Sequence, residues 1–403
     1  MSTTVQQPRA IRAINAVGGL VGRVGLQPKL DPGSLLDAAR KNTGLKDFGP
    51  YDFHEGLLRL TSSLEKEAQL TTLGRVAARQ RLVGLLETRL RLIDRLPAIK
   101  DEVIARPIFV LGLPRTGTTV LYGMLASNPA MRSPASWEVA RPFPAPSGVD
   151  PARVALMDKD FAGFRRIAPG IDHIHPLGSY LPQECLALQA PQLTSYEFAT
   201  TFPVPSYWAW LREQDMAPAY AFEKQFLQHL QSGGHRGEHW ILKTPCHLMW
   251  LDALLEVFPD ALLVHTHRNP TTVLASVSSL MSTFRSAVSD HIDPVAIGRE
   301  QLDAWTWGMQ RVMEVRARVP DDRVVDVHYE DTVAKPVETV ERVYEHLGLP
   351  YTDEVAAGVR SYLDDNPRDK HGSHSYSLEE FGLDRTEVDA AFAGYRERFG
   401  VSA

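Results

Sequence analysis

The 403-residue sequence has few cysteines, no surplus of positive charge and no long apolar run. Two cysteines, Cys185 and Cys246, are too few for a disulfide scaffold, and since no paired Cys/His spacing indicates a zinc site we expect two buried thiols. The 43 Lys and Arg residues against 49 Asp and Glu residues give a net charge of −6, which argues against a general nucleic-acid binder. No apolar run reaches the roughly 20 residues of a membrane span, and the first 30 residues do not resemble a secretory signal. We therefore expect a cytoplasmic protein with no transmembrane segment, no metal and no nucleic-acid partner.

The composition of the sequence, with 44% apolar and 23% charged residues, is typical of a soluble globular protein. Residues 1–50 are interrupted by glycine and proline, and from residue 53 to residue 96 apolar residues recur at helical spacing up to Pro97. We interpret the arginines of this stretch, among them Arg75 and Arg89, as a solvated helix surface. Residues 1–105 are predicted to form an N-terminal arm and helices packed on a core of residues 106–403.

From residue 106 onward, short strand-like runs alternate with helical segments. Apolar runs rich in β-forming residues cover residues 107–111, 240–242, 261–265 and 323–328, and helical spacing covers residues 120–127 and 247–258. Because strands and helices alternate, we predict an α/β fold with a central, mostly parallel sheet flanked by helices.

The segment from Gly112 to Thr119 joins the first strand to the first helix of this core. A glycine-bearing loop at a helix N-terminus presents unpaired N–H groups and the positive end of the helix dipole, and so favours an anion. The spacing of Gly112 and Gly117 is that of a P-loop, but Thr118 stands where an NTPase has lysine, and no strand ends in an acidic residue suited to magnesium. The cation is instead Arg115, so an oxyanion site fits better than an ATP or GTP site.

The run Pro114-Arg-Thr-Gly-Thr-Thr119 resembles the 5′-phosphosulfate loop of sulfotransferases that use 3′-phosphoadenosine 5′-phosphosulfate (PAPS), and most of all that of the bacterial family related to tyrosylprotein sulfotransferases. A second match is Arg268, at a strand end, with Ser276 eight positions later, the spacing of the family's 3′-phosphate site. The segment after Lys243 and the strand end at Tyr329 also resemble the family. The resemblance implies a P-loop-like sulfotransferase fold with an added N-terminal helical region.

The resemblance also implies a PAPS co-substrate and no metal. The residues expected to bind PAPS are Pro114, Arg115, Thr116, Gly117, Thr118, Thr119, Arg268, Ser276 and Tyr329, with Arg368 and Lys370 on a C-terminal loop that would cover the nucleotide. For Arg368 and Lys370, a charged loop exposed to solvent is an equally good interpretation of the sequence. Arg115 and Lys243 are expected to stabilise the leaving group and the transferring sulfuryl group. A surface lysine is the alternative for Lys243.

The general base predicted from the resemblance is Glu138, which lies 23 positions after Arg115, in the loop that follows the first helix of the core. Its alternative is a surface glutamate. A second polar cluster, Glu184 with His173 and His175, is expected to line the acceptor pocket or to supply another base. Nearby aromatics, Trp208 among them, are expected to form an apolar acceptor wall or plain core packing.

The predicted function is sulfuryl transfer from PAPS to a hydroxyl of a small-molecule or lipid-like acceptor. Two other functions stay open on the sequence: a nucleotide kinase or NTPase with an atypical P-loop, and a non-catalytic nucleotide-binding module. Whether the chain forms a homo-oligomer also stays open.

Overall fold

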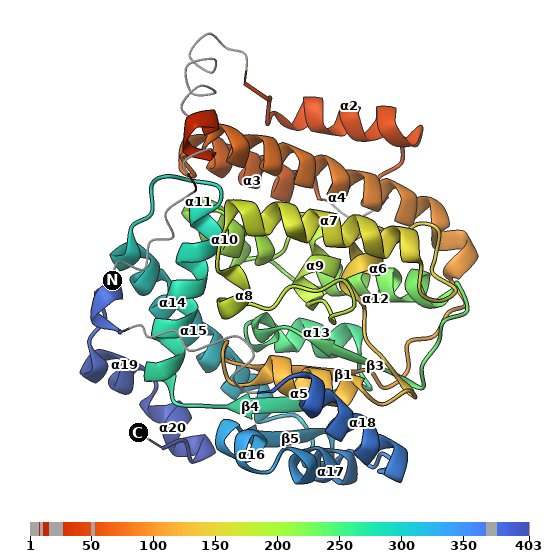
Figure 1. Cartoon of the computed structure of the whole chain (residues 1–403), viewed down its shortest axis with the longest axis vertical. Coiled ribbons are helices and arrows are strands. Elements are labelled where there is room, and N and C mark those ends of the chain that lie inside the picture. The colour runs from red at the N-terminus through yellow and green to blue at the C-terminus, as the bar shows by residue number, and fades with distance from the viewer. Residues whose placement is uncertain (1–7, 9–10, 16–26, 50–52, 368–376, 403) are drawn as a thin grey trace.

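The computed structural model describes residues 8, 11–15, 27–49, 53–367 and 377–402 (Figure 1). Its sheet has five strands, β1 (Ile108–Gly112), β2 (Met131–Arg132), β3 (His239–Lys243), β4 (Leu262–His267) and β5 (Val324–His328). They run parallel in the order β2-β3-β1-β4-β5. The predicted parallel α/β fold is confirmed, and the two-residue strand β2 is an addition that the sequence pattern did not predict.

The helices outnumber the strands and enclose them. Their bounds are α2 (Pro32–Thr43), α3 (His54–Lys66), α4 (Thr72–Ile99), α5 (Thr118–Ala126), α6 (Ser136–Ala140), α7 (Pro151–Ile167), α8 (Ile171–Ile174), α9 (Cys185–Gln189), α10 (Glu197–Thr201), α11 (Pro205–Leu211), α12 (Ala217–Gln231), α13 (Leu251–Val257), α14 (Pro270–Ser286), α15 (Pro294–Arg316), α16 (Tyr329–Ala334), α17 (Pro336–His346), α18 (Asp353–Asp365), α19 (Arg385–Ala391) and α20 (Ala393–Phe399). Short 3-10 turns cover Ala190–Gln192, Pro245–Leu248, Asp321–Arg323 and Glu379–Phe381. Among the residues described, no helix is long and apolar enough to cross a membrane.

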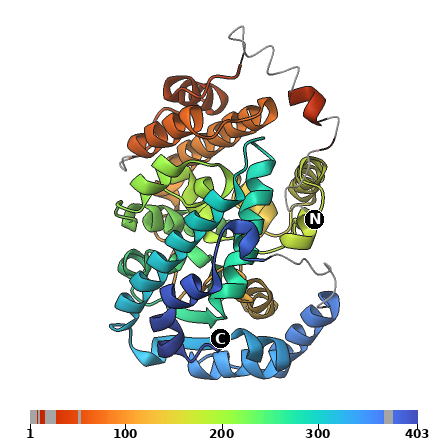
Figure 2. The ribbon, with the colours of Figure 1, turned by 90° about the vertical axis from the view of Figure 1, so that its left-hand side faces the viewer.

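The sheet is buried on both faces, as parallel sheets are. Successive residues of a strand point to opposite faces, so Phe109 and Leu263 join one hydrophobic cluster while Ile108 and Val264 join another. The second cluster is closed by α5, α17 and α18, which lie on the lower side of the molecule in Figures 1 and 2. The first cluster is the larger and continues through the middle of the molecule into the N-terminal helices.

Those helices, α2 to α4, lie at the end of the molecule opposite the sheet (Figure 2). The helical stretch predicted from residue 53 is two helices separated near residue 69, and Pro97 lies within the last turn of α4 rather than after it. The prediction of a solvated surface is wrong for Arg89, which has no exposed surface. Its Nε donates to the carbonyl of Phe48 at 2.7 Å and its guanidinium stacks 4.4 Å from the ring of Phe53, so packing by other segments removes it from water.

Candidate active site

The carboxyl ends of the parallel strands meet at one edge of the sheet, and the predicted site residues follow those ends. Gly112 ends β1, Lys243 ends β3, Arg268 follows β4 and Tyr329 follows β5. Above this edge lies a cavity of about 1270 Å³ whose lining includes the loop after β1 and the side chains of Lys243, Arg268 and Tyr329. The topology therefore gathers into one cavity residues as far apart in the sequence as Pro114 and Tyr329, as open parallel sheets do at this edge.

The loop after β1 has the backbone of an anion cradle. Gly117 caps α5 with φ 82°, and the first intrahelical bond is donated by Leu121 to the carbonyl of Gly117, so the N–H groups of residues 118–120 precede the helical ladder. Gly112 is needed for a different reason, since a Cβ there would lie 2.1 Å from Oγ1 of Thr266. A cradle of this kind favours phosphate or sulfate oxygens.

The predicted loop residues fall on two sides of that backbone. Pro114, Arg115, Gly117, Thr118 and Thr119 line the cavity. Thr116 does not: its buried hydroxyl lies 2.6 Å from Oγ1 of Thr266 and donates to the carbonyl of Leu113 at 2.7 Å. Thr116 therefore holds the loop against β4 with its side chain, which leaves its main-chain N–H as the group that can face an anion.

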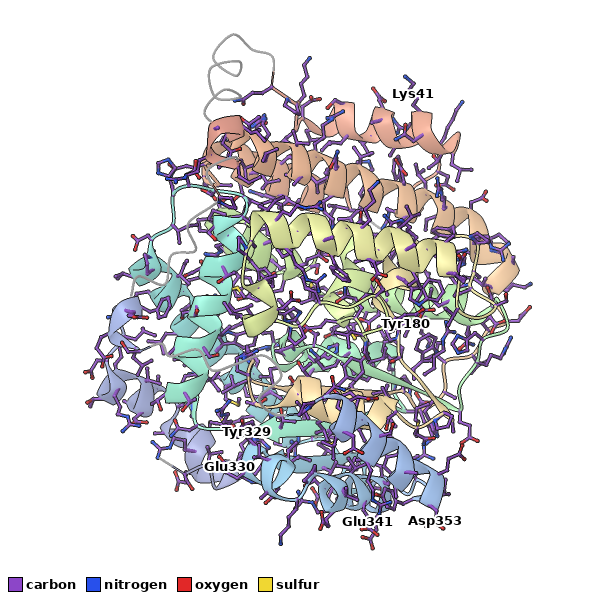
Figure 3. All side chains as sticks on the ribbon, viewed as in Figure 1. Lys41, Tyr180, Tyr329, Glu330, Glu341 and Asp353 are labelled. Carbon is purple, nitrogen blue, oxygen red and sulfur yellow. The ribbon has the colours of Figure 1, made fainter. Side chains whose placement is uncertain are left out.

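Arg115, Arg268, Ser276 and Tyr329 lie in direct contact. Arg115 donates from Nε to Oγ of Ser276 at 3.1 Å, and Arg268 donates to the carbonyl of Arg115 at 2.7 Å. The guanidinium of Arg268 also lies 3.8 Å from the ring centre of Tyr329. The sequence spacing of Arg268 and Ser276 thus corresponds to a shared cationic corner beside the loop. Tyr329 is labelled in Figure 3, at the start of α16.

Lys243 is paired with Glu184 on the other side of the loop. The Lys243 side chain is 3% exposed and donates to Oε1 of Glu184, while Thr244 donates to Oε2 at 3.1 Å. Burial by itself raises the pKa of Glu184, but the charge of Lys243 and these hydrogen bonds outweigh it and hold the pKa below its ordinary value. The carboxylate therefore stays ionised in the cavity at neutral pH.

His175 completes this polar group. It lines the same cavity, and burial, aided by the charges of Lys243 and Arg115 against that of Glu184, lowers its pKa to about 4. At neutral pH it is an uncharged imidazole. Of the second polar cluster predicted from the sequence, Glu184 and His175 thus reach the cavity, while the side chain of His173 lies outside the described residues, as do Arg368 and Lys370.

Glu138 and Trp208 are not among the residues that line the cavity. The Glu138 side chain is 2% exposed; it accepts from Arg132 at 3.0 Å and from the main-chain N–H of Ala135 at 2.9 Å, where α6 begins. Both carboxylate oxygens are therefore engaged in holding α6. Trp208 is buried among other aromatic rings, with the ring of Trp250 6.2 Å away.

One continuous part of the apolar wall of the cavity comes from α14, a helix from which sequence reasoning used only Ser276, for the nucleotide. Val277, Leu280, Met281 and Phe284 line the cavity, and the last three follow Val277 by three, four and seven positions, which places all four on one helix face. This apolar pattern, which begins one residue after Ser276, is the feature of the sequence from which the wall could have been predicted. Tyr180, labelled in Figure 3, lines the cavity too and is 62% exposed.

The chain resembles known proteins along most of its length. Residues 107–353 match the family model described as "Sulfotransferase family". The omega-hydroxy-beta-dihydromenaquinone-9 sulfotransferase of Mycobacterium tuberculosis is 27% identical over 322 residues, which cover 75% of this chain and 77% of that protein.

Two solved structures share the whole fold. The sulfotransferase STF1 of Mycobacterium tuberculosis has a TM-score of 0.79 at 35% identity, covering 90% of this chain and 98% of its own. The sulfotransferase STF9 of Mycobacterium avium has a TM-score of 0.84 at 28% identity, covering 93% and 98%. The similarity therefore includes the N-terminal helices as well as the core. The loop, the strand-end cations and these matches agree, and the chain belongs to the sulfotransferase family.

Proposed function

We propose that this sulfotransferase takes its sulfuryl group from PAPS and transfers it to a hydroxyl of a lipid-like acceptor. The observation that carries the proposal is that one cavity holds both an anion cradle with Arg115 and Arg268 and a lysine–carboxylate pair, Lys243 with Glu184. Its volume of about 1270 Å³ exceeds the roughly 300–1,000 Å³ typical of a single small-ligand site, which leaves room for a nucleotide and an acceptor together.

The residues present fit the nucleotide. The N–H groups at the start of α5 and the hydroxyls of Thr118 and Thr119 suit the 5′ end, and Arg268 suits the 3′-phosphate. Ser276, predicted beside it, is buried behind the lining and contacts Arg115. The ring of Tyr329, already stacked on Arg268, lies at the edge of this region. The chemistry that such a nucleotide supplies is an activated sulfuryl group on its 5′-phosphate.

Glu184, rather than Glu138, is the general base of this proposal. Both carboxylates accept hydrogen bonds through both oxygens, but Glu184 lines the cavity beside Lys243, whereas the buried Glu138 does not line it and is bonded to Arg132 and the start of α6. In transfer, the acceptor oxygen bonds to sulfur, the bond from sulfur to the bridging phosphate oxygen breaks, and Glu184 takes the hydroxyl proton.

Lys243 is assigned to the leaving phosphate. A lysine that donates to that phosphate leaves Glu184 with the hydrogen bond from Thr244 alone. Losing a neighbouring positive charge raises the pKa of a carboxylate, so the same movement that places Lys243 makes Glu184 a stronger base. Arg115 adds a second cation beside the loop.

The acceptor is assigned from the cavity wall and from one relative. The face of α14 formed by Leu280, Met281 and Phe284 suits an apolar body next to the reacting hydroxyl, and the relative named above acts on a hydroxylated menaquinone. The test is transfer of radiolabelled sulfate from PAPS to hydroxylated quinones, sterols and short alcohols. We expect turnover on the apolar acceptors and no need for magnesium; transfer from ATP instead would favour the kinase alternative.

A further inference from the structure

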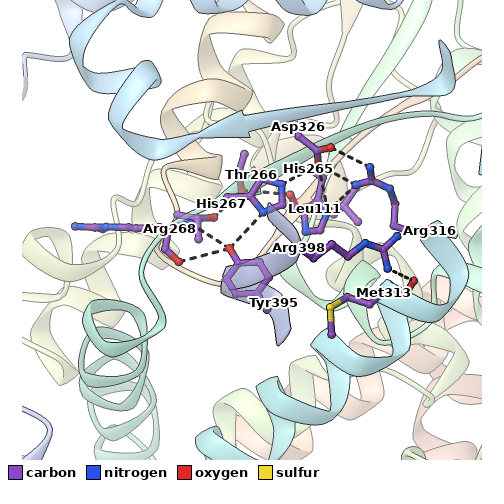
Figure 4. Close-up of polar contacts among 11 residues, drawn as sticks. Leu111, His265, Thr266, His267, Arg268, Met313, Arg316, Asp326, Tyr395 and Arg398 are labelled. Atoms are coloured by element: carbon purple, nitrogen blue, oxygen red, sulfur yellow. Dashed lines mark hydrogen bonds and ion pairs between the residues drawn. The ribbon is translucent and has the colours of Figure 1, made fainter. Parts of the chain in front are cut away.

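At the end of β4 lies a polar network of His265, His267, Asp326, Arg316 and Tyr395, in which only Asp326 is substantially exposed, with 38% of its side chain accessible (Figure 4). Three of these residues, His265, His267 and Asp326, offer atoms within 4.8 Å of one another that could hold a metal ion. However, Arg316 donates to both oxygens of Asp326, at 2.9 and 3.0 Å, and lies 2.9 Å from Nδ1 of His265. A guanidinium cation therefore already occupies the position that a metal ion would take.

The directions of the hydrogen bonds in this network follow from which atoms can donate and which can accept. The Asp326 carboxylate can only accept, so Nε2 of His267, 2.8 Å away, carries the proton and Nδ1 is left as an acceptor. The hydroxyl of Tyr395 lies 3.3 Å from that Nδ1 and 3.5 Å from the carbonyl oxygen of Arg268, and we assign its single proton to the shorter contact, the one with Nδ1. The same Tyr395 oxygen then accepts from the main-chain N–H of Arg268 at 3.3 Å.

Tyr395 therefore connects a fixed ion pair to the backbone of Arg268. Tyr395 is 1% exposed and His267 is fully buried, with its ring stacked 4.4 Å from that of Phe399. One residue further on, Asn269 donates to the carbonyl of Ser402 at 3.2 Å. Two contacts from the C-terminal segment thus hold the turn that carries Arg268, and Figure 4 shows Tyr395 reaching this turn from α20.

We propose that Tyr395 is a positioning residue for Arg268: by holding its main chain, it keeps the guanidinium between the carbonyl of Arg115 and the ring of Tyr329, where it can meet a 3′-phosphate. This inference rests on the proposed function. It gives α20, the helix that carries Tyr395, a part in discriminating nucleotides that bear a 3′-phosphate from those that do not.

The size of the effect follows from what Tyr395→Phe would remove. The ring and its packing stay, but the Arg268 N–H and Nδ1 of His267 both lose their partner. Losing one hydrogen bond of this kind corresponds to about a three- to tenfold change in an equilibrium constant. We expect that change in binding of a ligand with a 3′-phosphate, and none for the same ligand without it.

The test uses the full-length protein and calorimetric titration with adenosine 3′,5′-bisphosphate and with adenosine 5′-monophosphate. For Tyr395→Phe we expect the dissociation constant of the bisphosphate to rise about three- to tenfold, with that of the monophosphate unchanged. Tyr344→Phe is the matched control, because the Tyr344 hydroxyl is also buried and accepts from Asn128 at 3.0 Å, within the cluster formed with α5 and α17. It should leave both constants as in the wild type.

Arg268→Ala, titrated alongside, separates the two proposals. If it weakens both ligands equally, the 3′-phosphate assignment fails and the proposed nucleotide with it. If Arg268→Ala weakens binding of the bisphosphate alone, but Tyr395→Phe weakens binding of both ligands or of neither, the positioning role of Tyr395 is overturned. Should Tyr395→Phe not fold, His267→Phe keeps a ring against Phe399 and removes the Nδ1 acceptor that fixes the Tyr395 hydroxyl, and it must show the same selective loss.

Discussion

Replacing Glu184 by glutamine is the sharpest test of the proposed chemistry. The substitution removes the charge but keeps the shape, and an amide can still accept from Lys243 while Thr244 turns to accept from it. A general base contributes about 10²–10⁴-fold to turnover, which is about 3–5 kcal/mol of activation free energy. We expect kcat for the transfer of labelled sulfate from PAPS to fall by that factor in the folded protein. Because the Lys243 side chain is 3% exposed and loses its charged partner, we also expect a lower melting temperature.

Glu138→Gln is the matched control, because it makes the same change in the other candidate carboxylate. The Arg132–Glu138 pair is 2% exposed on both sides, and removing one partner of a buried pair costs about 3–5 kcal/mol of unfolding free energy. We expect a lower melting temperature and a wild-type kcat in the protein that remains folded. The opposite pattern, with turnover lost in Glu138→Gln and kept in Glu184→Gln, would refute the assignment of the base.

Three further substitutions test separate features. Lys243→Ala should lower kcat by about 10²–10³-fold, as the loss of a transition-state donor does, and change the KM for PAPS less; a wild-type kcat would contradict its role. Gly117→Ala puts a Cβ 3.0 Å from the Tyr329 ring at φ 82°, a strain of about 1–2 kcal/mol, so weaker binding of adenosine 3′,5′-bisphosphate is expected in titrations. Burial raises the pKa of Glu223 to about 8 in the folded protein, whereas in the unfolded chain it has the ordinary value of about 4.3. Between these two pH values the unfolded chain has lost the Glu223 proton and the folded protein still holds it, so the wild type loses stability as pH rises. The melting temperature of Glu223→Gln relative to the wild type should therefore climb over that range, and a constant difference would argue against the shift.

The pH dependence of turnover follows from the environment of Glu184. Because Lys243 and the hydrogen bonds hold its pKa below the ordinary value in the free enzyme, kcat/KM should stay level through neutral and mildly acidic pH and decline only where this carboxylate takes up a proton. A decline that begins near neutral pH would mean that another group, with a higher pKa, is the base.

The parallel sheet, the anion loop and the cationic corner could be predicted from the sequence because each depends on short stretches of chain. Strand, loop and helix from residue 107 to residue 127 follow one another directly, so their spacing encodes the cradle. Arg268 and Ser276 lie at a strand end and on the next helix, so their separation of eight residues sets their distance as well. When functional residues lie on consecutive elements, the geometry of the strand, loop and helix determines how those residues are placed relative to one another.

Tertiary packing decided which carboxylate faces the cavity and what holds Arg268 in place. Glu138 pairs with Arg132, six positions before it, which is itself held by the carbonyl of the distant His235. Glu184 instead pairs with Lys243, 59 positions away. Likewise, Tyr395 reaches Arg268 across 127 positions of sequence. The direction and burial of a side chain depend on the elements packed against it, and neither composition nor spacing along the chain specifies those neighbours.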